Sequence, residues 1–251
     1  TESKYVKRKG SKTTILIMEK KMSEEAKTAK TGMNNPYLKG HQIEIKPLVL
    51  GTYVLKYSLP MKLVNDINEM YDNAKPIELT PWNDKLAGKI EEENNIDNLL
   101  TPEMNEIFMG CFSGYMQHAL PTRKQWITVL NTAWINEMKD NEYNPFHTHS
   151  SAISEIGLSS VLMLKRPTNY GKEYSNNEIN TNGHLELGGG SQDVLSIAQI
   201  RVDAQVGDFY VFPYTVTHGV YPFNSTNQKR RTLSYNCDLL RPVKDTEKDN
   251  G

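Results

Sequence analysis

From Lys124 onward the chain is a succession of short strand-like segments, and no other feature constrains the fold as much. The segments are rich in Val, Ile, Trp, Tyr and Thr, and polar, Gly-containing or Pro-containing stretches separate them. They read QWITVLNTAWINEM, LSSVLMLK, LSIAQIRV, DFYVFP, HGVYPF and RRTLSYNCDLL. Such a series of short strands favours an antiparallel sandwich or barrel.

The segment before these strands predicts two amphipathic helices. Residues 59–75 and 101–120 each carry an apolar stripe at the spacing of helical turns, with Pro60 suited to a first turn and Thr101 to a cap. The stripes are Leu63, Val64, Ile67, Met70 and Tyr71 in the first helix, and Met104, Phe108, Cys111, Phe112 and Tyr115 in the second. With one or two strands expected over 43–59, the fold class is mainly β with flanking helices (α+β).

Charge and composition divide the chain into a body and two ends. Residues 1–42 hold ten Lys and Arg against four Glu, which indicates a solvated or partly disordered extension more than a basic interaction arm. The folded body is expected over 43–243, and KDTEKDNG at 244–251 reads as a terminal tail.

The whole-chain charge excludes some partners. With 29 basic and 30 acidic residues the formal charge is −1, so no global field draws the protein to nucleic acid or to a membrane. No apolar run approaches the roughly 20 residues that span a bilayer. Cys111 and Cys237 form no metal-spaced or redox pair, and we expect buried thiols in a cytoplasmic protein.

Three histidines lie where a barrel could bring them together. In NPFHTHS, His147 and His149 have the same parity if the segment is extended, so both rings project to one side. His218 follows an aromatic strand and a Pro-containing turn in VGDFYVFPYTVTHGV. The three could close a facial triad with coordination positions left open for substrate and O2. Alternatively, the histidines only satisfy loop hydrogen bonds.

The last strand places an arginine on a polar face. Alternation puts Arg230, Ser234 and Asn236 on one face, with Thr232 between them, and Arg231 on the opposite, mostly apolar face. A cavity-facing arginine can hold a carboxylate in a bidentate fork. An arginine at the surface of an edge strand is the alternative.

Taken together, NPFHTHS, LSSVLMLKRP, VGDFYVFPYTVTHGV and RRTLSYN resemble the Fe(II)- and 2-oxoglutarate-dependent oxygenases, most closely the prolyl-hydroxylase-like proteins of marine phages. The resemblance covers about residues 46–240. It implies a double-stranded β-helix, a jelly-roll, cupin-like barrel, with Fe(II) at its open end. It also implies the host cell's cytoplasm as the location if a phage encodes the protein.

The resemblance also implies roles for particular residues. His147 and His218 would be metal ligands, and no catalytic residue is expected beyond the ligands. At position 149 this chain has His where the family usually has an acid, so the third ligand is His149, a water molecule or Glu155. His149 is the first choice among these.

For the cosubstrate, the resemblance implies that a basic residue on a late strand grips the far carboxylate of 2-oxoglutarate. Arg230 is preferred to Arg231 because its parity matches Ser234, although a bulge between Lys229 and Thr232 would exchange the two arginines. Related sequences often have a Tyr where this chain has Met163. Met cannot donate the hydrogen bond that this Tyr gives to the cosubstrate, so Asn136, Ser160 or Tyr235 would donate it instead.

The function implied is hydroxylation of a C–H bond, with 2-oxoglutarate decarboxylated to succinate and O2 consumed. A peptidyl residue such as proline is the expected substrate, and a small molecule is the alternative. Two rival functions stay open: a three-histidine cupin-type metal dioxygenase that needs no 2-oxoglutarate, and a non-catalytic jelly-roll binding or virion module. The poorly patterned segment 166–195, with Gly188–Gly190, is a candidate lid.

Overall fold

The computed structural model describes residues 35–39, 43–49, 52–86, 88–119, 126–172, 180–190, 198–224 and 227–241, with the backbone alone for 44–49. The chain divides into two compact units, Thr1–His41 and Gln42–Gly251. In the first unit, residues 35–39 form a turn in which the Leu38 N–H donates to the Asn35 carbonyl. The rest of the basic extension and the tail at 244–251 lie outside the described residues.

The described part of the second unit contains two longer α-helices and the strands of two sheets. The helices are α2 (Met61–Asn73) and α3 (Pro102–Ala119), with short 3-10 turns η2 (Pro76–Glu78) and η3 (Asn83–Lys85). The strands are β1 (Glu44–Val49), β2 (Tyr53–Ser58), β3 (Thr80–Pro81), β4 (Glu92–Asn95), β5 (Ile127–Met138), β6 (Asn144–His147), β7 (Gly157–Lys165), β8 (Leu185–Gly188), β9 (Gln199–Val202), β10 (Asp208–Pro213), β11 (Thr217–Val220) and β12 (Arg230–Leu240).

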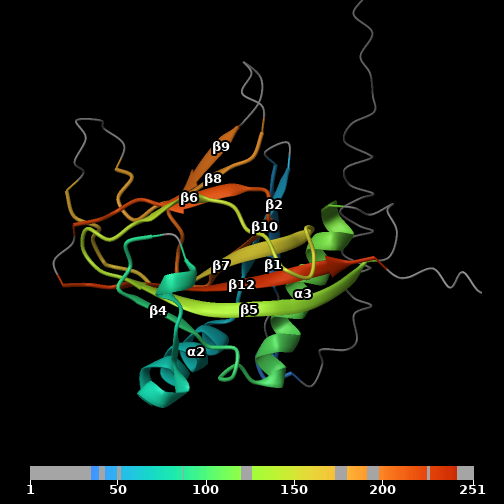
Figure 1. Ribbon diagram of the computed structural model, residues 1–251, viewed down its shortest axis with the longest axis horizontal. Helices are drawn as coiled ribbons and strands as arrows, with labels where there is room; N and C mark the ends of the chain where they lie inside the picture. Colours follow the sequence, from blue (N-terminus) through green and yellow to red (C-terminus); the bar gives the residue numbers. More distant parts are fainter. Residues whose placement is uncertain are drawn as a thin grey trace, which may run out of the picture. The chain divides into compact units, whose positions relative to one another are not determined.

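The strands form two antiparallel sheets, as in a double-stranded β-helix (Figure 1). The larger sheet has the order β1-β2-β10-β7-β12-β5-β4-β3, and the smaller has the order β6-β11-β8-β9. Since β10 pairs with β2, and β12 with β5, the fold brings together segments that the sequence separates widely. The predicted mainly β fold with flanking helices is confirmed.

The larger sheet has an apolar layer on each face. Between the two sheets, buried residues from β7, β8 and β10 pack together, among them Met163, Leu187 and Phe212. On the opposite face lie α2, below the strands in Figure 1, and α3, which runs past β12 and β5 on the right of the view. There Phe108 of α3 packs edge-on against Phe209 and Tyr235, with ring centroids 5.4 Å apart in each pair.

Both helices follow the predicted pattern. In α3 the Thr101 hydroxyl accepts from the Met104 N–H at 3.3 Å, which is the expected cap, and the predicted apolar stripe is buried. In α2 the predicted stripe is also buried except for Met70, which is half-buried, and Pro60 stands at the cap position rather than inside the first turn.

Segment 166–195 is not a continuous loop, and that expectation was wrong in part. Leu185–Gly188 forms β8, which pairs with both β11 and β9. Four residues are too few to show a strand period, so the pattern did not reveal this strand. Residues 173–179 and 191–197 of the candidate lid lie outside the described residues.

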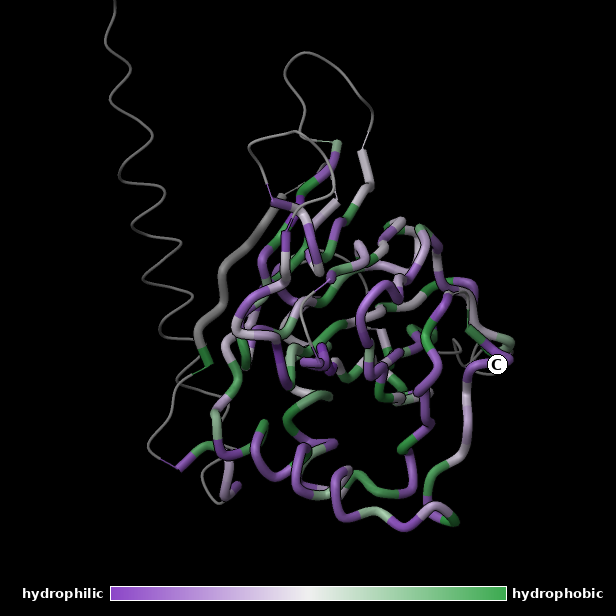
Figure 2. Tube along the Cα trace, turned by 90° about the vertical axis from the view of Figure 1, so that its left-hand side faces the viewer, coloured by the Kyte–Doolittle hydropathy of each residue, from purple (hydrophilic) through white to green (hydrophobic). Residues whose placement is uncertain are grey.

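Hydrophilic and hydrophobic segments are interspersed along the described trace in Figure 2. In the part of the chain that the structure describes, no helix is both long and apolar enough to cross a membrane.

Candidate functional site

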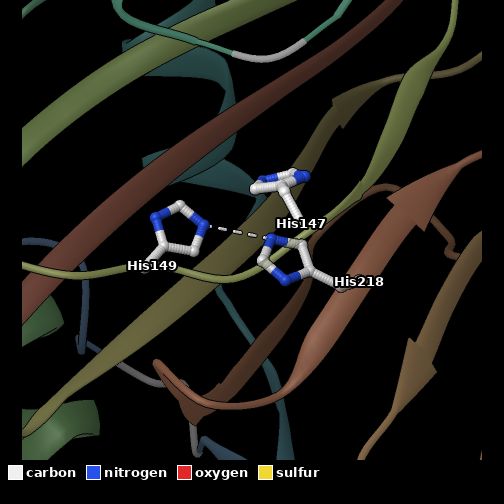
Figure 3. Close-up of side chains that lie close together, drawn as sticks. All are labelled: His147, His149 and His218. Carbon is white, nitrogen blue, oxygen red and sulfur yellow. Dashed lines mark hydrogen bonds between the residues drawn. The ribbon is translucent and has the colours of Figure 1, made fainter.

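Three histidine side chains meet between the two sheets (Figure 3). His147 ends β6 and His218 lies on β11, and the two residues are direct cross-strand neighbours with ring centroids 4.3 Å apart. His149 follows two residues after His147. One ring nitrogen from each of the three lies within 4.8 Å of the others. The structure therefore brings together the three histidines that the sequence singled out.

The separation of the rings suits a single metal ion. His149 Nε2 lies 3.1 Å from His218 Nε2. Two imidazole nitrogens that bind one ion at right angles, each at about 2.1 Å, would be about 3.0 Å apart. The donor set also fits Fe(II), since neutral imidazoles are ordinary ligands of iron and three of them on one side leave positions open.

Each imidazole is held in place by its surroundings. The Nδ1 atom of His147 lies 2.7 Å from the Pro145 carbonyl, and that of His218 lies 3.1 Å from the Val216 carbonyl. The His149 backbone N–H donates to the Tyr214 carbonyl at 3.0 Å. The first two contacts orient the rings of His147 and His218, and the third fixes the backbone that carries the His149 ring.

The His149 and His218 rings are neutral at physiological pH. Burial, with a further contribution from His147, lowers the pKa of His149 to about 3. Burial also lowers the pKa of His218 well below its ordinary value, and the neighbouring histidines add to this effect. A neutral imidazole offers a lone pair to a cation, so this environment favours metal binding over protonation.

A cavity of about 20 Å³ joins the three histidines to the start of β12. Its lining includes Asn136, Arg230, Thr232 and Ser234 together with apolar side chains such as Leu185. This volume holds about one water molecule. An ion fits without change, whereas a dicarboxylate requires the lining side chains to move apart.

Arg230 is the cation of this cavity. Its side chain is 1% exposed, its Nε donates to the Gly183 carbonyl at 3.1 Å, and its Nη1 faces the Met138 sulfur at 3.8 Å. Its Nη2 is buried without a hydrogen-bond partner. Burial lowers the pKa of Arg230, although a guanidinium stays charged at neutral pH. A buried guanidinium with an unused donor is matched by an anionic ligand that enters the cavity.

Arg231 points to the opposite face and is fully engaged there. Its Nε pairs with the Glu137 carboxylate, its Nη2 lies 2.7 Å from Asp72 Oδ1, and its Nη1 donates to Asn68 Oδ1 at 3.1 Å. Its guanidinium also lies over the Tyr71 ring, 4.7 Å from the centroid. Arg231 therefore fastens β12 to β5 and α2, and the structure does not bring it to the cavity.

The register explains why the two arginines separate in this way. Along β5, Arg230, Arg231 and Thr232 pair in unbroken succession with Met138, Glu137 and Asn136. The irregularity at this end of β12 concerns only its pairing with β7, between Arg231 and Thr232. Alternation is thus preserved, and the bulge that would have exchanged the two arginines does not occur on the β5 side.

Among the other candidate residues, some line the cavity and some do not. Asn136 Nδ2 donates to Ser234 Oγ at 3.2 Å, and Asn136 Oδ1 is buried without a partner in the cavity wall. Ser160 donates instead to the Tyr235 carbonyl, and Tyr235 packs on the helix side of the sheet. Glu155 is exposed and is not part of the histidine group.

For two residues of this site, the sequence predicted no role. Gly183, whose carbonyl accepts from Arg230, lies in the segment 166–195, where only the Asn-Gly dipeptide 182–183 signals a turn. Asn236 was placed on the polar face of β12 but given no role, and its Nδ2 lies 3.3 Å from His149 Nδ1.

Comparisons with known proteins agree with this geometry. Residues 132–236 match a family model described as "Putative 2OG-Fe(II) oxygenase", and this segment contains all three histidines, Arg230 and Asn136. No curated protein sequence matches the chain. The match covers less than half of the chain and supports the expectation of a 2OG-Fe(II) oxygenase, and the expected cofactors, Fe(II) and 2-oxoglutarate, agree with it, but it does not reach the marine-phage subgroup.

The fold also recurs among solved structures. HygX from Streptomyces hygroscopicus, solved with nickel and 2-oxoglutarate bound, is similar with a TM-score of 0.50 and 8% identity over 74% of this chain and 82% of that one. A prolyl-4-hydroxylase from Pseudomonas putida gives a TM-score of 0.49 and 14% identity, over 80% and 95% of the chains. The viral collagen prolyl hydroxylase of Paramecium bursaria Chlorella virus-1 gives 0.49 and 10%, over 76% and 97%. At these identities the likeness to HygX shows the shared fold alone.

Proposed function

We propose that this protein, whose residues 132–236 match the 2OG-Fe(II) oxygenase family, is a dioxygenase that hydroxylates a C–H bond, most simply of a peptidyl residue such as proline. One observation carries the proposal. A single cavity is lined by three histidines with converging nitrogens and by a buried arginine with an unused donor. The histidines can bind a metal ion, and the arginine can bind an anionic cosubstrate.

In this function His147, His149 and His218 hold the metal ion. The Pro145 and Val216 carbonyls accept from Nδ1 of the first and last of these residues, so that each presents a lone pair on Nε2. Fe(II) with 2-oxoglutarate and O2 supplies an oxidant for C–H bonds through decarboxylation to succinate. The chain's own share is to hold three ligands on one side of the ion and to leave the other side open.

Arg230 holds the far carboxylate of 2-oxoglutarate. Its unused Nη2 donates to one carboxylate oxygen, while Nε remains bonded to the Gly183 carbonyl. Ser234 and Asn136 complete the polar wall, and Asn136 accepts or donates through whichever end of its amide faces the ligand. Because the wall is buried, these contacts form away from competing water.

The proposed substrate is a peptidyl residue, most simply proline. A peptidyl residue is favoured because the sequence motifs resemble prolyl-hydroxylase-like proteins. A small molecule is the competing class. A rival without 2-oxoglutarate, the three-histidine dioxygenase, draws support from His149, which stands where the family usually has an acid. Arg230 opposes that rival, since a metal site without an anionic cosubstrate has no use for a buried guanidinium beside it.

A turnover assay tests the proposal. The purified protein is incubated with Fe(II), 2-oxoglutarate and O2, and succinate is measured alone, with proline-containing peptides, and with matched peptides carrying alanine in place of proline. We expect succinate in every wild-type reaction, more of it with the proline peptides, and one oxygen atom gained by those peptides. His218→Ala is the matched control and should give neither product.

Each other outcome discriminates between functions. Peptide oxidation that does not depend on 2-oxoglutarate would select the three-histidine dioxygenase. Equal stimulation by both peptide sets would remove proline as the target. Protein that takes up neither Fe(II) nor Ni(II) would leave only a non-catalytic binding module.

A further inference from the structure

The three histidines differ in what their Nδ1 atoms face. His147 and His218 each face a backbone carbonyl, which can only accept, so their protons sit on Nδ1 and their Nε2 lone pairs are free. His149 Nδ1 instead faces the side-chain amide of Asn236 at 3.3 Å, and the nearer atom is Nδ2, which can only donate. His149 Nδ1 is therefore an acceptor, and its single proton sits on Nε2.

This arrangement is self-consistent without a metal ion. His149 Nε2 donates to His218 Nε2 at 3.1 Å, and His218 Nδ1 donates in turn to the Val216 carbonyl. A ring that carries its proton on Nε2 has no lone pair there for a cation, however. In this state His149 is a hydrogen-bond donor rather than a ligand.

The same site contains what is needed to change this state. Asn236 Oδ1 is buried and has no hydrogen-bond partner. A carboxamide has nearly the same shape at both ends, so a half-turn exchanges the donor for the acceptor without moving its neighbours. After the turn, Oδ1 accepts from His149 Nδ1, and His149 Nε2 presents a lone pair beside that of His218. Two lone pairs 3.1 Å apart repel each other, and a cation between them turns this repulsion into attraction.

We propose that Asn236 is the positioning residue that makes His149 the third metal ligand, and that its amide turns when the metal ion binds. The inference rests on the proposed metal site and deepens it. Three features keep the His149 ring in place while its proton moves from Nε2 to Nδ1. Its backbone N–H is bonded to the Tyr214 carbonyl, and its ring lies near those of Trp134 and Tyr214, with centroids 5.9 and 6.1 Å away.

NMR on imidazole-labelled protein tests the proton position directly, since two-bond ¹H–¹⁵N spectra distinguish the two neutral ring forms. Diamagnetic Zn(II) serves as the probe ion. In the wild type we expect the His149 proton on Nε2 without metal and on Nδ1 with Zn(II). Asn236→Asp, which can only accept, should have the proton on Nδ1 even without metal. This spectroscopic result would not follow from a merely structural role.

Zn(II) affinity, measured by chelator competition, gives the second readout. Asn236→Leu has a similar size and no acceptor, and it should weaken binding about 10- to 100-fold, as loss of a ligand's hydrogen-bond partner typically does. Asn236→Asp should bind at least as tightly as the wild type. Adding Asn236→Leu to His149→Ala should cost little more than His149→Ala alone, because both changes remove the same ligand.

The outcomes separate this inference from the proposed function. Wild-type protein that binds no metal overturns both. Wild-type protein that binds Zn(II) and then 2-oxoglutarate, but with the His149 proton still on Nε2, overturns the inference alone. The same holds if Asn236→Leu binds Zn(II) as tightly as the wild type.

Discussion

Arg230→Met should weaken 2-oxoglutarate binding without destabilising the metal-free protein. The guanidinium is buried with Nη2 unpartnered, its Nε donates to the Gly183 carbonyl, and the nearby Tyr170 hydroxyl partly offsets the lowering of its pKa by burial. Truncating one partner of a buried, hydrogen-bonded charge pair costs about 2–5 kcal/mol, or on the order of 30- to 4,000-fold in Kd. Replacing a buried ion by an apolar side chain of similar size is often neutral or stabilising by roughly 1–4 kcal/mol. Since one hydrogen bond is also lost, we expect the free energy of unfolding to stay unchanged or to rise by up to about 2 kcal/mol.

Arg231→Met is the matched control and should show the reverse pattern. It removes the partner of the buried Glu137 carboxylate and of Asp72, while Lys229 remains 2.9 Å from Glu137. We expect a loss of about 2–4 kcal/mol in unfolding free energy, because a buried charge then keeps only part of its compensation. Its 2-oxoglutarate affinity should stay within about threefold of the wild type, less than 1 kcal/mol, because Arg231 does not line the cavity.

Two assays on both variants test the different roles of Arg230 and Arg231. Urea denaturation of the metal-free proteins gives the free energy of unfolding, and calorimetric titration of the Ni(II)-loaded proteins gives the 2-oxoglutarate affinity. The reasoning is refuted if Arg230→Met binds 2-oxoglutarate normally, or if Arg231→Met loses as much affinity as Arg230→Met does.

Three further predictions concern stability. Burial raises the pKa of the Glu93 carboxyl to about 7, with a contribution from Glu142, so the wild type should lose up to about 3 kcal/mol of stability as pH rises from 4.5 to 7. Urea denaturation at several pH values should show that the unfolding free energy of Glu93→Gln depends less on pH than that of the wild type. An equal pH dependence in both proteins would contradict the raised pKa. Gly183→Ala should lower the free energy of unfolding by roughly 2–4 kcal/mol, because Gly183 has φ +66° and a Cβ would lie 2.3 Å from the Tyr170 ring. Gly110→Ala, in open space on α3, is the control and should leave the free energy of unfolding unchanged or raise it. Ni(II) at about 100 times its Kd should stabilise the protein by about 2.7 kcal/mol and raise its Tm, and no rise in Tm would argue against a preformed metal site.

The sequence could predict the elements whose pattern is local. The stripe from Met104 to Tyr115 and the cap at Thr101 specify α3 without reference to the rest of the chain. The long alternation of β12 predicts which of Arg230 and Arg231 faces the cavity. These signals extend over many residues, so single exceptions do not obscure them.

Other parts of the site depend on partners that are distant in the sequence. β8 has four residues and is a strand because β9 and β11 flank it. The contact of Gly183 with Arg230 joins residues 47 positions apart, and that of Asn236 with His149 joins residues 87 apart. Such pairings depend on which strands become neighbours, and no local pattern records them.

Anaerobic titration with Fe(II) and then 2-oxoglutarate tests the central claim most directly, because a keto-acid chelated to Fe(II) produces a metal-to-ligand charge-transfer band. We predict the band in the wild type, its loss in His147→Ala and His218→Ala, and its appearance only at higher 2-oxoglutarate concentration in Arg230→Met. Wild-type protein that binds Fe(II) but shows no band would remove 2-oxoglutarate from the site. An undiminished band in His218→Ala would place the metal ion elsewhere.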